Sequence, residues 1–197
     1  MAANLGADAI GLVFVKESPR CVNVSQARDI VDSLPENVAR VGVFVNEAPD
    51  TVRQTIDEMG LTAVQLHGDE DAAYVAGLGI SVPVIKAMAF GPQLNGMIEQ
   101  WGHKAILVDH ATTTHRGGTG FPWDWSELKT IQRPPYLIVA GGLRADNVAG
   151  AIRTLAPDAV DVASGIESRP GIKDGEKMRA FVKACAPFRK GRRPFLT

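Results

Sequence analysis

Short runs of apolar residues recur along the chain at regular intervals, separated by longer stretches in which polar residues predominate. Runs with almost no polar position inside them are typical of parallel strands that are covered on both faces. The pattern predicts seven strands, at residues 8–14, 39–45, 63–68, 83–88, 105–110, 136–142 and 159–165.

Amphipathic stretches with polar first residues lie between several of these runs. They predict helices over residues 24–34, 48–60, 144–155 and 173–186. We expect the first to begin at Ser25, and the second to begin at Pro49 and end at Gly60. Alternating strands and helices imply parallel strands joined by right-handed crossovers. The fold class is therefore α/β, as either an open doubly wound sheet or a closed (β/α)8 barrel.

Glycine and polar residues gather after the carboxyl ends of many predicted strands. In a barrel these ends all converge on one face, which carries the chemistry, whereas an open sheet gathers only those near a switch point. A TIM barrel is therefore favoured. Such a barrel has eight strands, and residues 1–5 read as the last turn of a helix. We expect that strand 1 and most of helix 1 are missing from this chain.

Length and composition predict one domain and narrow the range of partners. The chain has 197 residues, of which 45% are hydrophobic, and we expect a single incomplete barrel over residues 1–188 with a basic tail at 189–197. The net charge of -1 gives no reason to expect nucleic acid or a membrane surface as partner. With two cysteines, no signal peptide and no membrane span, a cytoplasmic location is predicted.

Two glycine-containing segments end adjacent predicted strands. Gly141 and Gly142 follow one strand, and Ser164 and Gly165 end the next. Either segment alone could simply turn the chain. Loops after the last two strands of a barrel commonly bind phosphate through backbone N–H groups and the start of a short helix, so the two segments together favour a phosphate site.

Several motifs resemble those of the phosphoribosylanthranilate isomerase family, in the order in which that family has them. They are Ser18-Pro19-Arg20, VQLHG (64–68), LVDH (107–110), GGTG (117–120), DW (124–125), AGGL (140–143) and VDVASGIESRPGIKD (160–174). The resemblance implies a TIM barrel that converts N-(5′-phosphoribosyl)anthranilate to 1-(2-carboxyphenylamino)-1-deoxyribulose 5-phosphate. This reaction is an Amadori rearrangement in tryptophan biosynthesis, and the family uses no metal or organic cofactor.

The resemblance also implies roles for five residues. Asp109 matches the general acid, which protonates the furanose ring oxygen and opens the sugar to a Schiff base. Arg20 matches the arginine that meets the anthranilate carboxylate, a bidentate contact suited to a guanidinium group. Gln65, His67 and Asp161 match positions that line the substrate pocket. From the residues alone, core or strand-cap roles fit these three equally well.

Two features of the chain leave other functions open. His110 and His115 near Asp109 are compatible with a metal site, as in barrel enzymes that epimerise pentose phosphates. No second carboxylate and histidine stand at ligand positions, so we expect no metal. Residues 115–120 resemble the family's loop over the barrel mouth, which would order on substrate binding and exclude water.

The family's general base is a cysteine on the first strand, and neither Cys21 nor Cys185 lies at that position. We therefore expect this chain to bind phosphorylated ligands with strongly reduced turnover. It would be a monomer or a homodimer, prone to associate through its open strand edges. Three accounts are open: a fragment whose complete protein is an ordinary isomerase, a non-catalytic binder of phosphorylated sugars, and an interaction partner whose gap is filled by another chain or by its own tail.

Overall fold

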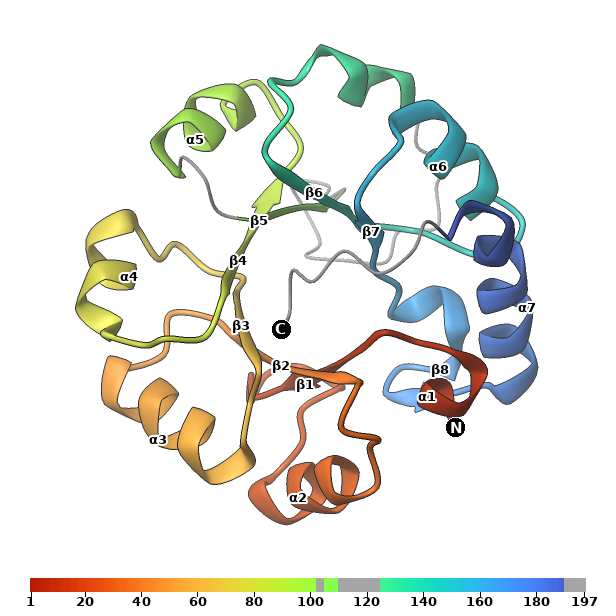
Figure 1. Ribbon diagram of the computed structural model, residues 1–197. Coiled ribbons are helices and arrows are strands. Elements are labelled where there is room, and N and C mark those ends of the chain that lie inside the picture. The colour runs from red at the N-terminus through yellow and green to blue at the C-terminus, as the bar shows by residue number, and fades with distance from the viewer. Residues whose placement is uncertain (102–104, 110–124, 190–197) are drawn as a thin grey trace. The chain divides into compact units, whose positions relative to one another are not determined.

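The computed structural model describes residues 1–101, 105–109 and 125–189 (Figure 1). The chain divides into two compact units, with the boundary between residues 86 and 87. His110, His115, the loop at 115–120 and residues 190–197 of the predicted tail lie outside the described residues.

Seven strands are hydrogen bonded in the order in which they occur along the chain. The first unit contains β1 (Ala9–Val13), β2 (Ala39–Phe44), β3 (Ala63–Leu66) and the start of β4 (Val84–Ala89). The second unit contains the end of β4 with β5 (Ala105–Asp109), β6 (Tyr136–Val139) and β7 (Ala159–Val160). Paired strands run parallel, and each strand falls within or beside one of the predicted runs. The predicted α/β class with seven parallel strands is confirmed.

The expectation that strand 1 is missing from this chain is not supported. The sheet begins with β1, which pairs with β2 from Ala9 opposite Ala39 to Val13 opposite Val43. A short helix, α1 (Ala2–Leu5), precedes β1 and ends at Gly6, whose φ of 102° turns the chain into the strand. The expectation depends on a count against the eight strands of a standard barrel, whereas the structure shows a regular strand, each residue of which pairs with β2, where the sheet begins.

The helices of the first unit are α2 (Val24–Asp32), α3 (Pro49–Met59) and α4 (Ala72–Leu78). Helix α2 begins before Ser25 because Asn23 caps it. The Asn23 side chain accepts the Gln26 N–H, and the Gln26 side chain accepts the Asn23 N–H, both at 2.9 Å. Helix α3 begins at Pro49 and stops at Gly60, as predicted. Gly60 adopts a left-handed conformation there.

The helices of the second unit are α5 (Leu94–Trp101), α6 (Val148–Leu155) and α7 (Gly175–Cys185), with 3-10 segments η1 (Trp125–Thr130), η2 (Ser164–Ile166) and η3 (Ala186–Phe188). The predicted last strand, residues 159–165, stops at Val160 because its second half forms η2. A two-stranded antiparallel hairpin, β8 (Glu167–Arg169) with β9 (Ile172–Lys173), then leads into α7. Helices α4 and α5 are not among the predicted helices.

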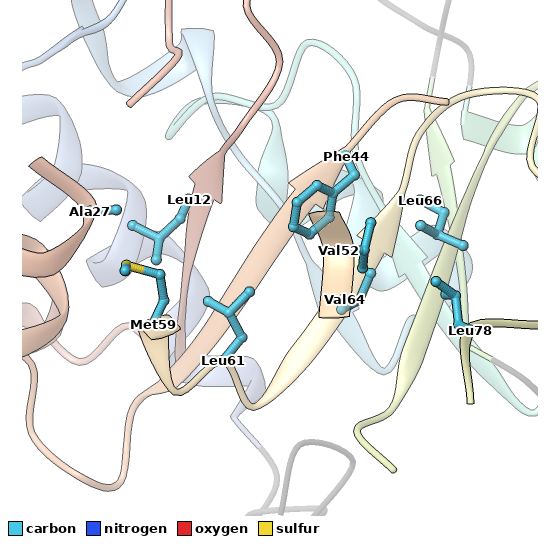
Figure 2. Close-up of a cluster of buried hydrophobic side chains, with 9 residues drawn as sticks. All are labelled: Leu12, Ala27, Phe44, Val52, Met59, Leu61, Val64, Leu66 and Leu78. Carbon is cyan, nitrogen blue, oxygen red and sulfur yellow. The ribbon is translucent and has the colours of Figure 1, made fainter. Parts of the chain in front are cut away.

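One side of the first unit's strands packs against its helices, as Figure 2 shows. The cluster is formed by Leu12, Phe44, Val64 and Leu66 of the strands, Ala27, Val52, Met59 and Leu78 of the helices, and Leu61 between α3 and β3. Val64 and Leu66 lie two positions apart and therefore point to the same face of β3. Gln65 between them points to the opposite face, away from this cluster.

A smaller cluster in the second unit joins the end of β6 to the helices that follow. Leu143, Val148 and Ala151 pack with Phe181 of α7, and Val160 and Ile166 lie against them. The segments after β6 and β7 are thus anchored to one hydrophobic cluster. Among the described residues, no helix is both long and apolar enough to cross a membrane.

Candidate active site at the strand ends

The predicted site residues follow the carboxyl ends of strands in both units. Because the strands within a unit are parallel, their carboxyl ends lie at one edge of its sheet. The first unit contains Arg20, Gln65 and His67, and the second contains Asp109, Gly141, Gly142, Asp161, Ser164 and Gly165.

Arg20 lies in a tight turn between β1 and α2. Its backbone N–H donates to Ser18 Oγ at 3.1 Å, and the N–H of Cys21 donates to the Ser18 carbonyl at 3.0 Å. The N–H of Val22 donates to the carbonyl of Val13 at 2.9 Å, which ties the turn back to the last residue of β1. Arg20 is half-buried in this arrangement. These bonds fix the backbone of Arg20 close to the end of β1.

Gln65 and His67 lie together at the end of β3. Gln65 is buried, and its Nε2 atom is 3.2 Å from Nδ1 of His67. The Gln65 amide and the His67 ring are therefore within hydrogen-bonding distance of each other. The backbone N–H of His67 donates to the Phe44 carbonyl at 2.8 Å, which extends the β2–β3 ladder past the end of β3. The pair can therefore present a hydrogen-bond donor at the strand end.

A buried ion pair that the sequence analysis missed lies beside the turn at residues 68–70, which follows His67. Lys86 Nζ of β4 is 2.8 Å from Glu70 Oε2, and the two side chains are 3% and 1% exposed. Lys86 Nζ also donates to the Gly68 carbonyl at 2.6 Å, while the Glu70 carboxylate accepts the N–H groups of Gly68 and Asn46 at 2.9 and 2.7 Å. The signal in the sequence is a lysine inside the apolar run 83–88.

Charge and close packing both define this turn. Burial raises the pKa of the Glu70 carboxyl, but hydrogen bonds from Lys86 and from the backbone N–H groups outweigh it and hold the pKa below its usual value. A methyl group at Gly68 would overlap the side chain of Asn46, whose φ of 50° is left-handed. The turn that follows His67 is thus fixed by a buried charge pair and by close contact with the loop after β2.

In the second unit, Asp109 is the last residue of β5. Its backbone carbonyl accepts the N–H of Phe90 at 2.9 Å, and its Oδ1 atom is shielded from solvent. The residue is half-buried as a whole. Regular strand pairing therefore sets the position of its carboxyl group.

The structure brings the two predicted phosphate-binding segments into contact. Gly141 and Gly142 follow β6 with φ of 83° and 64°, and Asn147 Nδ2 donates to the Gly142 carbonyl at 2.9 Å. Gly165 lies in η2 against the carbonyl of Leu143, so closely that a methyl group there would overlap the oxygen. Glycine is therefore required at position 165.

Asp161 directly follows β7, and its side chain is exposed. Its backbone N–H donates to the Val139 carbonyl at 2.9 Å, which continues the β6–β7 ladder. The chain then passes through exposed Ser164 into η2. The predicted residues of this unit thus stand at the ends of β5, β6 and β7.

Parallel α/β strands that carry acidic, basic and glycine residues at their carboxyl ends are the architecture of TIM-barrel enzymes. The model of the N-(5′-phosphoribosyl)anthranilate (PRA) isomerase family matches residues 1–184. The chain belongs to this family. Its fold is of the TIM-barrel class, and the family's activity is an isomerisation in tryptophan biosynthesis.

Individual relatives agree with this assignment. The N-(5′-phosphoribosyl)anthranilate isomerase of Myxococcus xanthus is 45% identical over 186 residues, which cover 91% of this chain and 86% of the relative. A solved phosphoribosyl anthranilate isomerase in complex with reduced 1-(o-carboxyphenylamino)-1-deoxyribulose 5-phosphate is 34% identical, with a TM-score of 0.81 over 94% of this chain and 91% of the other. A monomeric form of the dimeric Thermotoga maritima enzyme is 34% identical, with a TM-score of 0.80 over 94% and 90%.

Proposed function

We propose that this chain converts N-(5′-phosphoribosyl)anthranilate to 1-(2-carboxyphenylamino)-1-deoxyribulose 5-phosphate, with Asp109 as general acid. The contact between Gly165 and the Leu143 carbonyl carries the proposal, in a chain of this family. It brings the backbone segments after β6 and β7 side by side, and backbone N–H groups of such glycine segments can bind a phosphate group.

The first step of the reaction needs a proton donor at the sugar ring. The Asp109 carboxyl gives its proton to the furanose ring oxygen, the bond between C1′ and that oxygen breaks, and the nitrogen lone pair forms the Schiff base. The shielding of Oδ1 from solvent supports this role, because a donor out of contact with water delivers its proton to the substrate. The backbone pairing with Phe90 fixes the donor while the ring opens.

Recognition of the substrate's other groups is assigned to residues at the remaining strand ends. Arg20 binds the anthranilate carboxylate through two parallel N–H donors, and the fixed position of its backbone near the end of β1 supports this. Gln65, His67 and Asp161 bind the sugar hydroxyls. The contact between Gln65 Nε2 and His67 Nδ1 at 3.2 Å supports a shared role, because it holds the two side chains together at the end of β3.

The second step transfers the C2′ proton to a base and gives an enolamine, and addition of a proton at C1′ then gives the ketone. We assign neither cysteine as that base. Burial raises the pKa of the Cys185 thiol, which disfavours the thiolate, and Cys21 Sγ is 3.8 Å from the Val22 carbonyl, to which it donates. These cysteine environments favour a second candidate function, the binding of phosphorylated sugars without turnover.

Turnover by the purified chain decides between the two candidates. The isomerase proposal expects loss of the substrate's anthranilate fluorescence at an enzymatic rate. Asp109→Asn should lower kcat by about a hundredfold or more with little change in substrate affinity, because only the proton transfer is lost. Asp57→Asn, on the exposed surface of α3, is the matched control.

Near-normal kcat in Asp109→Asn would remove Asp109 from the acid role. Phosphate-dependent binding without turnover in the unmodified chain would support the second candidate. Cytoplasmic location, the domain limits and the choice between monomer and homodimer stay predictions, and light scattering of the same preparation measures the last. The dimeric state of the Thermotoga maritima relative favours the homodimer.

A further inference from the structure

The turn η2, which contains Ser164 and Gly165, is bonded at both of its ends to one side chain. Lys173 Nζ donates to the Ala163 carbonyl at 3.1 Å, just before the turn. The same ammonium group donates to Glu167 Oε1 at 2.9 Å, just after the turn. Lys173 therefore spans η2 from its entry to its exit.

Further bonds from the same segment hold the exit of the turn. The N–H of Asp174 donates to the Ile166 carbonyl at 2.8 Å, and Lys177 Nζ donates to the Glu167 carbonyl at 2.8 Å. Asp174 also caps α7 by accepting the N–H groups of Glu176 and Lys177. The turn is thus fastened to the first residues of a regular helix.

The other side of the turn packs closely against the segment after β6. Gly165 lies against the Leu143 carbonyl, where even a methyl group would overlap. A displacement of η2 by a few tenths of an ångström would either open this contact or compress it. The two halves of the motif SGIE and PGIKD are therefore parts of one bonded unit.

We propose that Glu167 and Lys173 are positioning residues that set the geometry of the phosphate-binding turn Ser164–Ile166. The inference rests on the proposed function, because it assumes that this turn meets the substrate's phosphate. The two side chains act through the backbone of the turn. Glu167 is 4% exposed and Lys173 is 39% exposed, so the buried carboxylate has a fixed position and the lysine reaches across the turn to bind it.

A different reading gives Lys173 a direct electrostatic role as one more positive charge near a phosphate dianion. The two readings make opposite predictions for Glu167→Gln. Removing a negative charge strengthens phosphate binding if charge alone matters. If the Glu167–Lys173 bond positions the turn, the same substitution weakens phosphate binding.

The test measures kcat and KM together with competitive inhibition by inorganic phosphate, for the unmodified chain and four variants. Lys173→Met and Glu167→Gln should each raise KM and the phosphate inhibition constant roughly fivefold to twentyfold, because the first removes the ammonium donor and the second replaces a charged acceptor with a neutral amide. The kcat should change less than twofold, because the reacting atoms are elsewhere. Lys173→Arg should restore most of the loss. Lys183→Met, which removes an exposed charge from the last turn of α7, should change nothing.

Each outcome decides the inference. Tighter phosphate binding in Glu167→Gln, or an unchanged KM in Lys173→Met, overturns it while the proposed function stands. Thermal unfolding measures the folded fraction of each variant. If kcat and the folded fraction fall by the same factor, the two residues have a merely structural role, which also overturns the inference. An unmodified chain that neither turns over substrate nor responds to phosphate overturns the proposed function, and the inference falls with it.

Discussion

Replacing Lys86 by methionine tests the strongest electrostatic feature of the first unit. In the folded protein the Glu70 carboxylate accepts three hydrogen bonds, from Lys86 Nζ at 2.8 Å and from the N–H groups of Gly68 and Asn46 at 2.9 and 2.7 Å. The substitution leaves the carboxylate buried with two backbone donors and no opposing charge. Breaking a buried pair in this way costs about 3–5 kcal/mol, because the remaining charge is not solvated. No discount for solvent screening applies, since the side chains are 3% and 1% exposed.

A double-mutant cycle separates the pair from the effects of each substitution alone. In Glu70→Gln with Lys86→Met no buried charge remains, and the new amide can donate to the Gly68 carbonyl, which accepts Lys86 Nζ at 2.6 Å in the unmodified chain. We expect the double variant to lose only about 1–2 kcal/mol. The coupling energy between the two positions should therefore be about 2 kcal/mol or more. Lys16→Met, at an exposed position of the same unit, is the control.

The effect of Lys86→Met should also depend on pH. The pKa of Glu70 in the folded state is below its usual value of 4.5, because bonds from Lys86 and the backbone outweigh the effect of burial. The unfolded chain thus binds a proton more readily, and the contribution of Glu70 to stability is present above that value and lost as the pH falls through the folded pKa. In Lys86→Met a protonated Glu70 carries no charge, so the deficit relative to the unmodified chain should shrink in acid.

Urea unfolding followed by circular dichroism, from about pH 8 to about pH 4, measures both the cycle and its pH dependence. A single substitution that costs less than about 1 kcal/mol at neutral pH would contradict the reasoning. So would strict additivity of the two substitutions, or a deficit that grows in acid.

Two further predictions concern the binding of substrate. Gly165→Ala should raise KM and the phosphate inhibition constant more than tenfold, because the methyl group displaces the turn from the Leu143 carbonyl. Gly77→Ala in α4, which has open space around it, is the control and should change neither constant. Enzyme kinetics with and without inorganic phosphate measure this, and an unchanged inhibition constant would remove the turn from phosphate binding. Arg20→Lys should raise KM about tenfold with kcat little changed, because lysine cannot make the bidentate contact with a carboxylate. Equal KM values for the variant and the unmodified chain would exclude that contact.

The strands and the longer helices could be predicted because each has a local cause in the sequence. Strands buried on both faces are nearly continuous apolar runs, and α3 carries its own start and stop at Pro49 and Gly60. Helix α4 was harder to predict because it has only seven residues and contains Gly77. Helix α2 begins where Asn23 and Gln26 bond reciprocally, and Ser25 between them is an equally good cap by type alone.

The ion pairs could not be predicted because they depend on which residues the fold brings together. Glu70 and Lys86 meet because β3 and β4 pair with Leu66 opposite Lys86, which places the lysine beside the turn after β3. Glu167 and Lys173 meet because β8 and β9 form a hairpin with these two residues opposite each other. Residue type shows that such groups are polar, but only the register shows their partners.

Polar residues at strand ends therefore have two proposed roles that one sequence pattern does not separate. In the proposed function some of them contact the ligand, and others hold the turn that contacts it. The exposure of the lysine side chain distinguishes the two ion pairs that hold these turns. Lys86 is 3% exposed and is part of the core, whereas Lys173 is 39% exposed and lies at the surface. Loss of the Glu70–Lys86 pair removes an interaction between two buried charges and lowers the free energy of unfolding. Loss of the Glu167–Lys173 pair, of which only the carboxylate is buried, lowers it less and also lets the turn shift. Variants at positions 70 and 86 should thus be recognised by their unfolding curves, and variants at 167 and 173 by their KM values.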